Sequence, residues 1–142
     1  MQRSLVGSEM CKETDLGLTP QHVNAFGGNK VQGKSTEAAQ SIIDAALAVQ
    51  EAGAFAVVLE CIPAKLAKEL SESLDIPTIG IGAGVGCDGQ VQVVNDLLGL
   101  FTDFIPKHAK RYANLSAEIE RAFKEYVDDV KNRRFPTDAN SF

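Results

Sequence analysis

The sequence predicts an α/β fold in which helices cover a parallel sheet, with about the size of half a (β/α)8 barrel. Short apolar runs rich in β-branched residues alternate with stretches of helical period, and glycine or proline stands between them. Successive runs lie about 24 residues apart, which is the compact spacing of βα units. A complete barrel needs about 200–250 residues, and the chain has 142. We therefore expect about four βα units, with parallel strands and an open edge.

The first clear element is a helix over residues 37–52. Ser35 or Thr36 can cap its start, and Gly53 provides the stop. Its apolar residues recur every three or four positions, which predicts one face packed against the sheet. Upstream, residues 1–14 mix charged and apolar residues without a clear period.

A buried strand is expected next, over residues 55–59, where five apolar residues follow one another. Glu60 ends this run. An ionised carboxylate is costly to bury unless it is paired, so Glu60 either lies at the rim of the sheet or has a chemical task. Because catalytic groups gather at the carboxyl ends of parallel strands, both a rim residue that caps a helix or forms an ion pair and a functional carboxylate fit the pattern.

The middle of the chain continues the alternation. A second helix is expected to begin at Pro63 and to end before Ile76-Pro77, because a residue before proline avoids the helical conformation. A second buried strand follows over residues 78–82. We then expect a short helix over residues 91–98 and a last strand over residues 100–105.

A long amphipathic helix closes the predicted fold, with Ser116 as its expected N-cap and an irregular tail over residues 133–142. Its apolar face is formed by Ile119, Phe123, Tyr126, Val127 and Val130.

The glycine-rich loop after the second strand allows two interpretations. Residues 84–89 match the pattern G-x-G-x-x-G, which in a strand-to-helix turn holds the pyrophosphate of a dinucleotide. However, Gly80 and Gly82 extend the glycines into the strand itself, and no acidic residue ends a clear second strand about 20 residues on. A substrate-contacting loop at the mouth of a barrel explains the same glycines.

Composition excludes several classes of function. The net charge is −5, the chain has no Trp, and its densest basic cluster is the short segment 107–111, so nucleic-acid binding is disfavoured. No apolar run approaches the length of about 20 residues that a membrane span needs. The start of the chain lacks the apolar region of a secretory signal, which indicates a cytoplasmic protein. The three cysteines are scattered, so neither a zinc site nor a disulfide framework is expected. His22 and His108 have no nucleophile at a recognisable spacing.

Several motifs together resemble one family. In their order along the chain, they resemble those of ketopantoate hydroxymethyltransferase (3-methyl-2-oxobutanoate hydroxymethyltransferase), and the resemblance extends over about residues 16–142. The motifs are Leu16-Gly-Leu-Thr-Pro-Gln21, Phe26-Gly-Gly-Asn-Lys-Val-Gln-Gly33, Leu59-Glu-Cys-Ile-Pro63, Ile76-Pro-Thr-Ile-Gly-Ile-Gly-Ala-Gly84, Asp88-Gly-Gln90 and Ile105-Pro-Lys-His-Ala-Lys110.

The resemblance implies a (β/α)8-barrel enzyme of pantothenate biosynthesis. Because a half barrel leaves strand edges unpaired, we also expect a homo-oligomer. Such an enzyme transfers a hydroxymethyl group from 5,10-methylenetetrahydrofolate to an oxo acid, 3-methyl-2-oxobutanoate, and forms 2-dehydropantoate. Mg²⁺ holds the oxo acid and polarises its carbonyl group. The family's catalytic base matches Glu60, and the loop that contains Gly82 and Gly84 is the candidate substrate-binding segment.

The departures from the family pattern lead to a narrower expectation. Thr14-Asp15 stands where the family has Gly-His, and residues 1–14 do not resemble the half that carries the metal-binding aspartates. We therefore expect a divergent segment over residues 1–15 and the C-terminal half of the barrel over residues 16–142. This chain would supply no metal ligands and would be weak or inactive alone. The alternatives are a non-catalytic half-barrel, which associates with itself or with an N-terminal half, and a dinucleotide-binding module.

Overall fold

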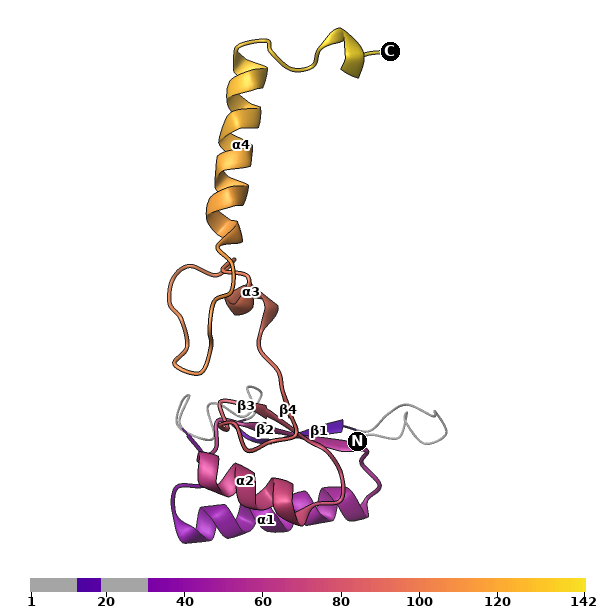
Figure 1. Ribbon diagram of the computed structural model, residues 1–142, viewed down its shortest axis with the longest axis vertical. Coiled ribbons are helices and arrows are strands. Elements are labelled where there is room, and N and C mark those ends of the chain that lie inside the picture. Colours follow the sequence, from indigo (N-terminus) through magenta and orange to yellow (C-terminus); the bar gives the residue numbers. More distant parts are fainter. Residues whose placement is uncertain (1–12, 19–30) are drawn as a thin grey trace, which may run out of the picture. The chain divides into compact units, whose positions relative to one another are not determined.

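The computed structural model describes residues 13–18 and 31–142. These residues form two compact units that divide between Val91 and Gln92 (Figure 1), and each unit is described by itself.

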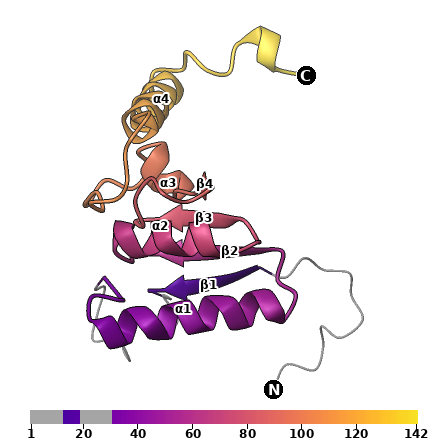
Figure 2. The ribbon, with the colours of Figure 1, turned by 60° about the horizontal axis from the view of Figure 1, so that its bottom comes forward.

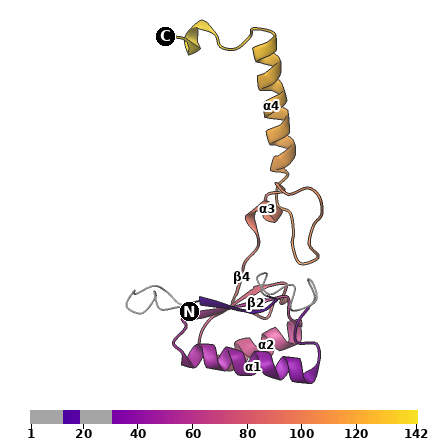
Figure 3. The same ribbon diagram turned by 180° about the vertical axis from the view of Figure 1, so that it is seen from behind.

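The first unit is a parallel sheet with helices on one face. Its strands follow one another across the sheet in chain order, and each pairs in parallel with the next. The two connecting helices lie on the same face of the sheet in views from opposite sides (Figures 1 and 3). The elements are β1 (Glu13–Gly17), α1 (Thr36–Glu51), β2 (Ala56–Glu60), α2 (Ala64–Ser73), β3 (Thr78–Ile81) and β4 (Gly89–Gln90). The prediction of an α/β fold with an open parallel sheet is confirmed.

The core of this unit lies between the sheet and the helices. Val57 and Leu59 of β2 are fully buried in it. Since side chains alternate between the two faces of a strand, Val58 and Glu60 lie on the opposite face, away from α1 and α2. The other buried members of the core are Ala46, Ile62, Leu66, Ala67, Leu70, Leu74 and Ala83.

The predicted ends of α1 are confirmed. The Ser35 hydroxyl accepts a hydrogen bond from the Ala38 N–H at 3.2 Å, which is the bond of an N-cap. After the helix, Gly53 adopts a φ of 82°, a left-handed conformation that glycine reaches without steric cost. The next helix starts one residue later than predicted, because Pro63 is its N-cap.

Two strands that the sequence analysis did not identify form the edges of the sheet (Figure 2). β1 is polar and short, and it is held by its pairing with β2 in the register Leu16 to Leu59. β4 has only two residues, of which Gly89 pairs with Ile79 of β3. Neither strand has the apolar run from which a strand is recognised in a sequence.

The strand predicted over residues 100–105 is wrong, since these residues form no strand. The N–H groups of Leu100 and Phe101 both donate to the Asn95 carbonyl oxygen. The carbonyl oxygen of Phe101 accepts from the Arg111 guanidinium group. These bonds satisfy the backbone locally and leave no strand ladder, although the residues themselves have high β-propensity.

The second unit contains α3 (Val94–Leu97), α4 (Leu115–Lys131) and the short 3₁₀ helix η2 (Asp138–Asn140). The expected short helix is therefore confirmed only for the four residues of α3. Asn114, and not Ser116, is the N-cap of α4, and its side chain makes no capping hydrogen bond. No residue of α4 is buried. Within residues 13–18 and 31–142, no helix is both long and apolar enough to cross a membrane.

Candidate active site at the carboxyl edge of the sheet

Glu60 is the last residue of β2 and lies in a row with the last residues of its neighbours. The strand register places Gly17 of β1 beside Glu60, and Ile81 of β3 on its other side. The carboxyl ends of three parallel strands thus meet at one level. This is the place where βα folds bind ligands and position catalytic groups, so the position predicted for Glu60 at the end of a strand is confirmed.

The backbone around Glu60 is closely packed against β1. Its carbonyl oxygen accepts a hydrogen bond from the Leu18 N–H at 2.9 Å. A Cβ atom added to Gly17 would lie 2.1 Å from the same oxygen, and Gly17 has a φ of 101°. Only glycine fits there, because any side chain would push β1 away from Glu60. The Glu60 side chain itself is half-buried.

The residue that follows Glu60 has an unusual backbone conformation. Cys61 has a φ of 50°, which is uncommon for a residue other than glycine. Its N–H donates to the Ile81 carbonyl oxygen at 2.8 Å, and its own carbonyl oxygen accepts from the Gln32 N–H at 2.9 Å. Two segments therefore fix this conformation. Strained backbone of this kind is found often at functional sites.

The pKa of the neighbouring Cys61 thiol is shifted as well. Burial raises the pKa of the Cys61 thiol, and the negative charge of Glu60 raises it further. A thiol with a raised pKa stays protonated at neutral pH and is a poor nucleophile. Of these two neighbours, Glu60 is accordingly the candidate for chemistry.

A second carboxylate lies on the same face of the sheet. Asp15 of β1 pairs with Val58 of β2, two residues before the row of Glu60, and its side chain is exposed. By the alternation along each strand, Asp15 and Glu60 both lie on the face away from the helices. Half-buried Val58, Ile79 and Ile81 share this face. This face thus combines apolar side chains with the Glu60 carboxylate at the carboxyl end of β2 and the Asp15 carboxylate two residues before that level.

The glycines after β3 fit closely against α2. Gly82 and Gly84 have φ values of 67° and 80°. A Cβ atom on Gly84 would lie 2.5 Å from the Ala64 Cβ, and one on Gly86 would lie 2.8 Å from the Lys68 Cβ. Close packing of the loop on the helix accounts for Gly84 and Gly86. That Gly82 and Gly84 contact substrate stays a prediction.

The dinucleotide-binding interpretation of residues 84–89 is wrong. A pyrophosphate site requires a helix that begins at the end of the glycine loop, so that its N-terminus faces the phosphates. Here the loop leads into strand β4 at Gly89. The next helix begins only at Val94 and has four residues.

A hydrogen-bonded network that the sequence analysis missed lies at the other end of the strands, where their amino ends meet. Thr78 is fully buried, and both its N–H and its hydroxyl group donate to Asp88 Oδ2, at 2.8 and 2.9 Å. These bonds lower the pKa of the Asp88 carboxyl group. Thr78 begins β3, and in barrel folds the amino ends of the strands serve stability rather than catalysis. In the sequence, the only sign of this network is Asp88-Gly89, which directly follows the glycine-rich loop.

Among the described residues, no three side chains of His, Cys, Asp or Glu lie together as they would around a metal ion. The part of the chain that the structure describes therefore does not by itself fit a magnesium site. His22 lies outside the described residues.

Comparison with known proteins gives one consistent family. Residues 3–138 match the sequence profile of ketopantoate hydroxymethyltransferase. The chain is 60% identical over 127 residues to the 3-methyl-2-oxobutanoate hydroxymethyltransferase of Enterococcus faecalis, which covers 89% of this chain and 46% of that protein. The corresponding protein of Clostridium botulinum is 51% identical over 140 residues, 99% of this chain and 51% of that protein. The chain spans about half the length of the curated relatives it matches.

Proposed function

We propose, from the premise that the chain belongs to the ketopantoate hydroxymethyltransferase family, that it forms the C-terminal half of that family's catalytic barrel. The complete enzyme would act in the cytoplasm on 3-methyl-2-oxobutanoate, with 5,10-methylenetetrahydrofolate as the one-carbon donor, and would produce 2-dehydropantoate for pantothenate biosynthesis. Glu60 is its general base.

The position of Glu60 carries this proposal. Its side chain lies at the carboxyl end of a central strand and on the sheet face that α1 and α2 leave uncovered. In a closed barrel this face lines the interior, and its carboxyl end is where substrate binds. The backbone bonds on both sides of Cys61 hold the strand end in place, so that the carboxylate is oriented before substrate arrives.

The chemistry requires a carboxylate of this kind. The base takes the proton from C3 of the oxo acid, and the electron pair of that C–H bond becomes the π bond of an enolate. Water adds to the methylene carbon of the folate, and the two C–N bonds of that carbon break as the folate nitrogens take up protons, which gives formaldehyde. The enolate carbon forms the C–C bond to this formaldehyde, the electron pair of its C=O π bond moves to the oxygen, and the oxygen takes up a proton to become the hydroxymethyl group. Glu60 acts only in the first step.

Magnesium, which the family implies, would polarise the carbonyl group of the oxo acid. The described residues do not bring three ligands together. From the family resemblance we expect the ligands in the other half of the barrel, and no step here is assigned through the ion. For the same reason, we expect the chain alone to be weak or inactive.

The alternative is a half-barrel without activity of its own, and one observation favours it. The sheet is open, with β1 at one edge and β4 at the other. Unpaired strand edges promote association with another chain, either a second copy or an N-terminal half.

Deuterium exchange at C3 of 3-methyl-2-oxobutanoate, followed by proton NMR in D2O with Mg²⁺, separates these functions, because exchange reports proton abstraction without folate. The chain would be assayed alone and after co-refolding with the unmatched half of the Enterococcus faecalis relative. We expect exchange in the mixture, and a loss of at least about 100-fold with Glu60→Gln, since general bases contribute about 10²–10⁴-fold.

The matched control is Glu51→Gln, which removes an exposed carboxylate at the end of α1. It should leave exchange unchanged. Exchange that survives Glu60→Gln would contradict the role of Glu60. A stable complex of the two halves with no exchange at all would favour the inactive half-barrel.

A further inference from the structure

Asp15 of β1 and Glu60 of β2 lie on the same face of the parallel sheet. The strand register pairs Asp15 with Val58, two residues before Glu60. Because side chains alternate along both strands, all three residues lie on the face away from α1 and α2. The inference drawn from this placement rests on the role proposed for Glu60 and concerns how the neighbouring acid alters that role.

The two carboxyl groups belong to diagonal neighbours in the sheet. Adjacent strands lie about 4.8 Å apart and rise about 3.3 Å per residue, so the Cα atoms of Asp15 and Glu60 are about 8 Å apart. At the level of Glu60 itself, β1 carries Gly17. Gly17 contributes no side chain that would separate the two carboxyl groups, and Asp15 is the next residue of β1 on this face.

The strand side chains around the two carboxyl groups are apolar. Val58, Ile79 and Ile81 lie on the same face and are half-buried. In a closed barrel this face lines the interior, where water screens charges less than at an open surface. At an effective dielectric constant of about 20–40, one negative charge about 8 Å from a carboxyl group raises the pH at which that group loses its proton by about 0.8–1.5 pH units.

The other charged groups near Glu60 stay the same when Asp15 is changed. On β1, Glu13 lies two residues further from the level of Glu60 than Asp15 does. On the other side of β2, strand β3 contributes no charged residue. The described segment that bonds to Cys61 carries one charge, that of the exposed Lys34. Burial raises the pKa of the Cys61 thiol, which therefore stays protonated at neutral pH. A comparison of the wild type with an Asp15 variant thus isolates the effect of Asp15.

We propose that Asp15 tunes the catalytic base: its negative charge on the same face of the sheet strengthens the hold of Glu60 on a proton. Glu60 then ionises at a higher pH and, as a stronger base, takes the proton from C3 of the oxo acid faster once it is ionised. Asp15 is a positioning residue, because it acts through Glu60 and does not itself contact the substrate.

Carbon-13 NMR of the chain labelled at the glutamate carboxyl carbons tests this effect without an activity. The chain is titrated at low salt, alone and in the complex with the unmatched half of the Enterococcus faecalis relative. Loss of one signal in Glu60→Gln identifies Glu60. We expect Asp15→Asn to lower the midpoint of the Glu60 titration by about 0.8–1.5 pH units in the complex. The change should be smaller in the chain alone, where water screens the two charges.

The pH dependence of deuterium exchange at C3 of the oxo acid gives a second measurement. A weaker base ionises at a lower pH but abstracts a proton more slowly. The profiles of the wild type and of Asp15→Asn in the complex should therefore cross, with the variant about 2–5-fold slower at the plateau and about 2–5-fold faster well below the midpoint. Damage to the structure would instead slow exchange at every pH. Asp15→Glu, which keeps the charge, should restore the wild-type profile.

The matched control is Asp44→Asn, which removes an exposed carboxylate from α1, on the other side of the sheet. It should change neither measurement. A Glu60 midpoint that stays the same in Asp15→Asn, both alone and in the complex, overturns the proposal. A midpoint that falls in a complex without exchange supports the effect of Asp15 on Glu60 and contradicts only the function proposed for Glu60.

Discussion

The two units of this chain differ in where they place their apolar residues. Among the described residues, every buried hydrophobic side chain lies between Leu18 and Ala83, in the unit that contains the sheet. In the unit that begins at Gln92, large apolar side chains such as Phe104, Phe123 and Tyr126 are exposed. Both units contain regular helices, but among the described residues only the first unit has a core of buried apolar side chains.

This difference shows what stabilises each unit. The sheet unit is held by apolar burial, which contributes about 1.5–3 kcal/mol for each large side chain. The helix α4 is held mainly by ion pairs along its own surface, such as those of Arg121 with Glu118 and Glu125. Such exposed pairs contribute much less than a buried apolar side chain, because water screens them. The apolar stripe of α4, from Ile119 to Val130, adds little to this stability, because its side chains are exposed.

The largest difference in the free energy of unfolding is expected between two Leu→Ala substitutions, one in each unit. Leu70 is 1% exposed, and Leu100 is 37% exposed. Leu70→Ala should lower the free energy of unfolding by about 2–5 kcal/mol, because it leaves a cavity in a packed core. Leu100→Ala should cost less than about 1 kcal/mol. Urea unfolding followed by circular dichroism measures both, and equal losses would show that the second unit has a core of comparable quality.

An effect of intermediate size on stability is expected from substitution of Gly17, which lies beside Glu60 of the candidate site. Gly17 and Gly53 both have positive φ values, but only at Gly17 would a Cβ atom meet the backbone, 2.1 Å from the Glu60 carbonyl oxygen. Gly53→Ala should cost about 1 kcal/mol from conformation alone. Gly17→Ala should cost about 1–3 kcal/mol more and should separate β1 from β2.

Amide hydrogen exchange at Leu18, whose N–H donates to Glu60, reports this separation directly. Unchanged protection of this amide in Gly17→Ala would show that β1 accommodates a side chain, and that the tight contact beside Glu60 is dispensable.

The smallest effect concerns acid sensitivity. Hydrogen bonds from Thr78 keep the pKa of Asp88 below its ordinary 3.8 in the folded chain. Asp88 therefore contributes stability above about pH 4, and this contribution is lost as the pH falls through the lowered pKa. Asp88→Asn should lower stability at neutral pH and flatten its loss on acidification, measured by urea midpoints between about pH 6 and pH 2. The effect is small because the carboxyl group is exposed.

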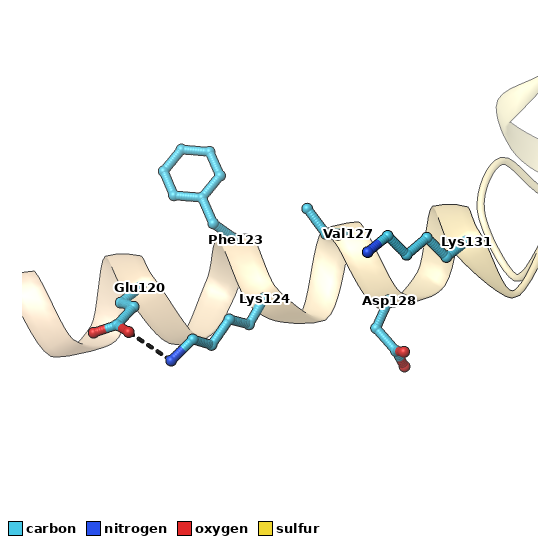
Figure 4. A pocket seen from close by; sticks show the side chains of 6 residues that line it. All are labelled: Glu120, Phe123, Lys124, Val127, Asp128 and Lys131. Atoms are coloured by element: carbon cyan, nitrogen blue, oxygen red, sulfur yellow. Dashed lines mark hydrogen bonds and ion pairs between the residues drawn. The ribbon is translucent and has the colours of Figure 1, made fainter.

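Glu120 provides the comparison in the second unit. Its pKa is lowered by the hydrogen bond and charge of Lys124 (Figure 4). Glu120→Gln should reduce the acid sensitivity of α4 helicity and leave that of the sheet unit unchanged.

For the sheet unit, a steeper loss of stability on acidification in Asp88→Asn than in the wild type would contradict the role of the Thr78 network.

The candidate site was predictable only in part. Glu60 could be identified because a carboxylate directly after five apolar residues marks the end of a buried strand. Its neighbours could not be identified in the same way, since Gly17 and Ile81 come beside it through strand register. The φ of Cys61 is likewise set by backbone bonds to Ile81 and Gln32, and no local pattern encodes them.

By itself, the sequence determined the elements whose apolar period and caps are local: α1 with its Ser35 cap, the strands β2 and β3, and the stripe of α4. The tertiary structure alone decided which segments without such signals become strands. Polar β1 and two-residue β4 are strands because β2 and β3 offer them backbone partners. Residues 100–105 have the composition of a strand and form none, because their backbone groups bond to Asn95 and Arg111. A helix satisfies its own hydrogen bonds, whereas a strand exists only through its neighbour.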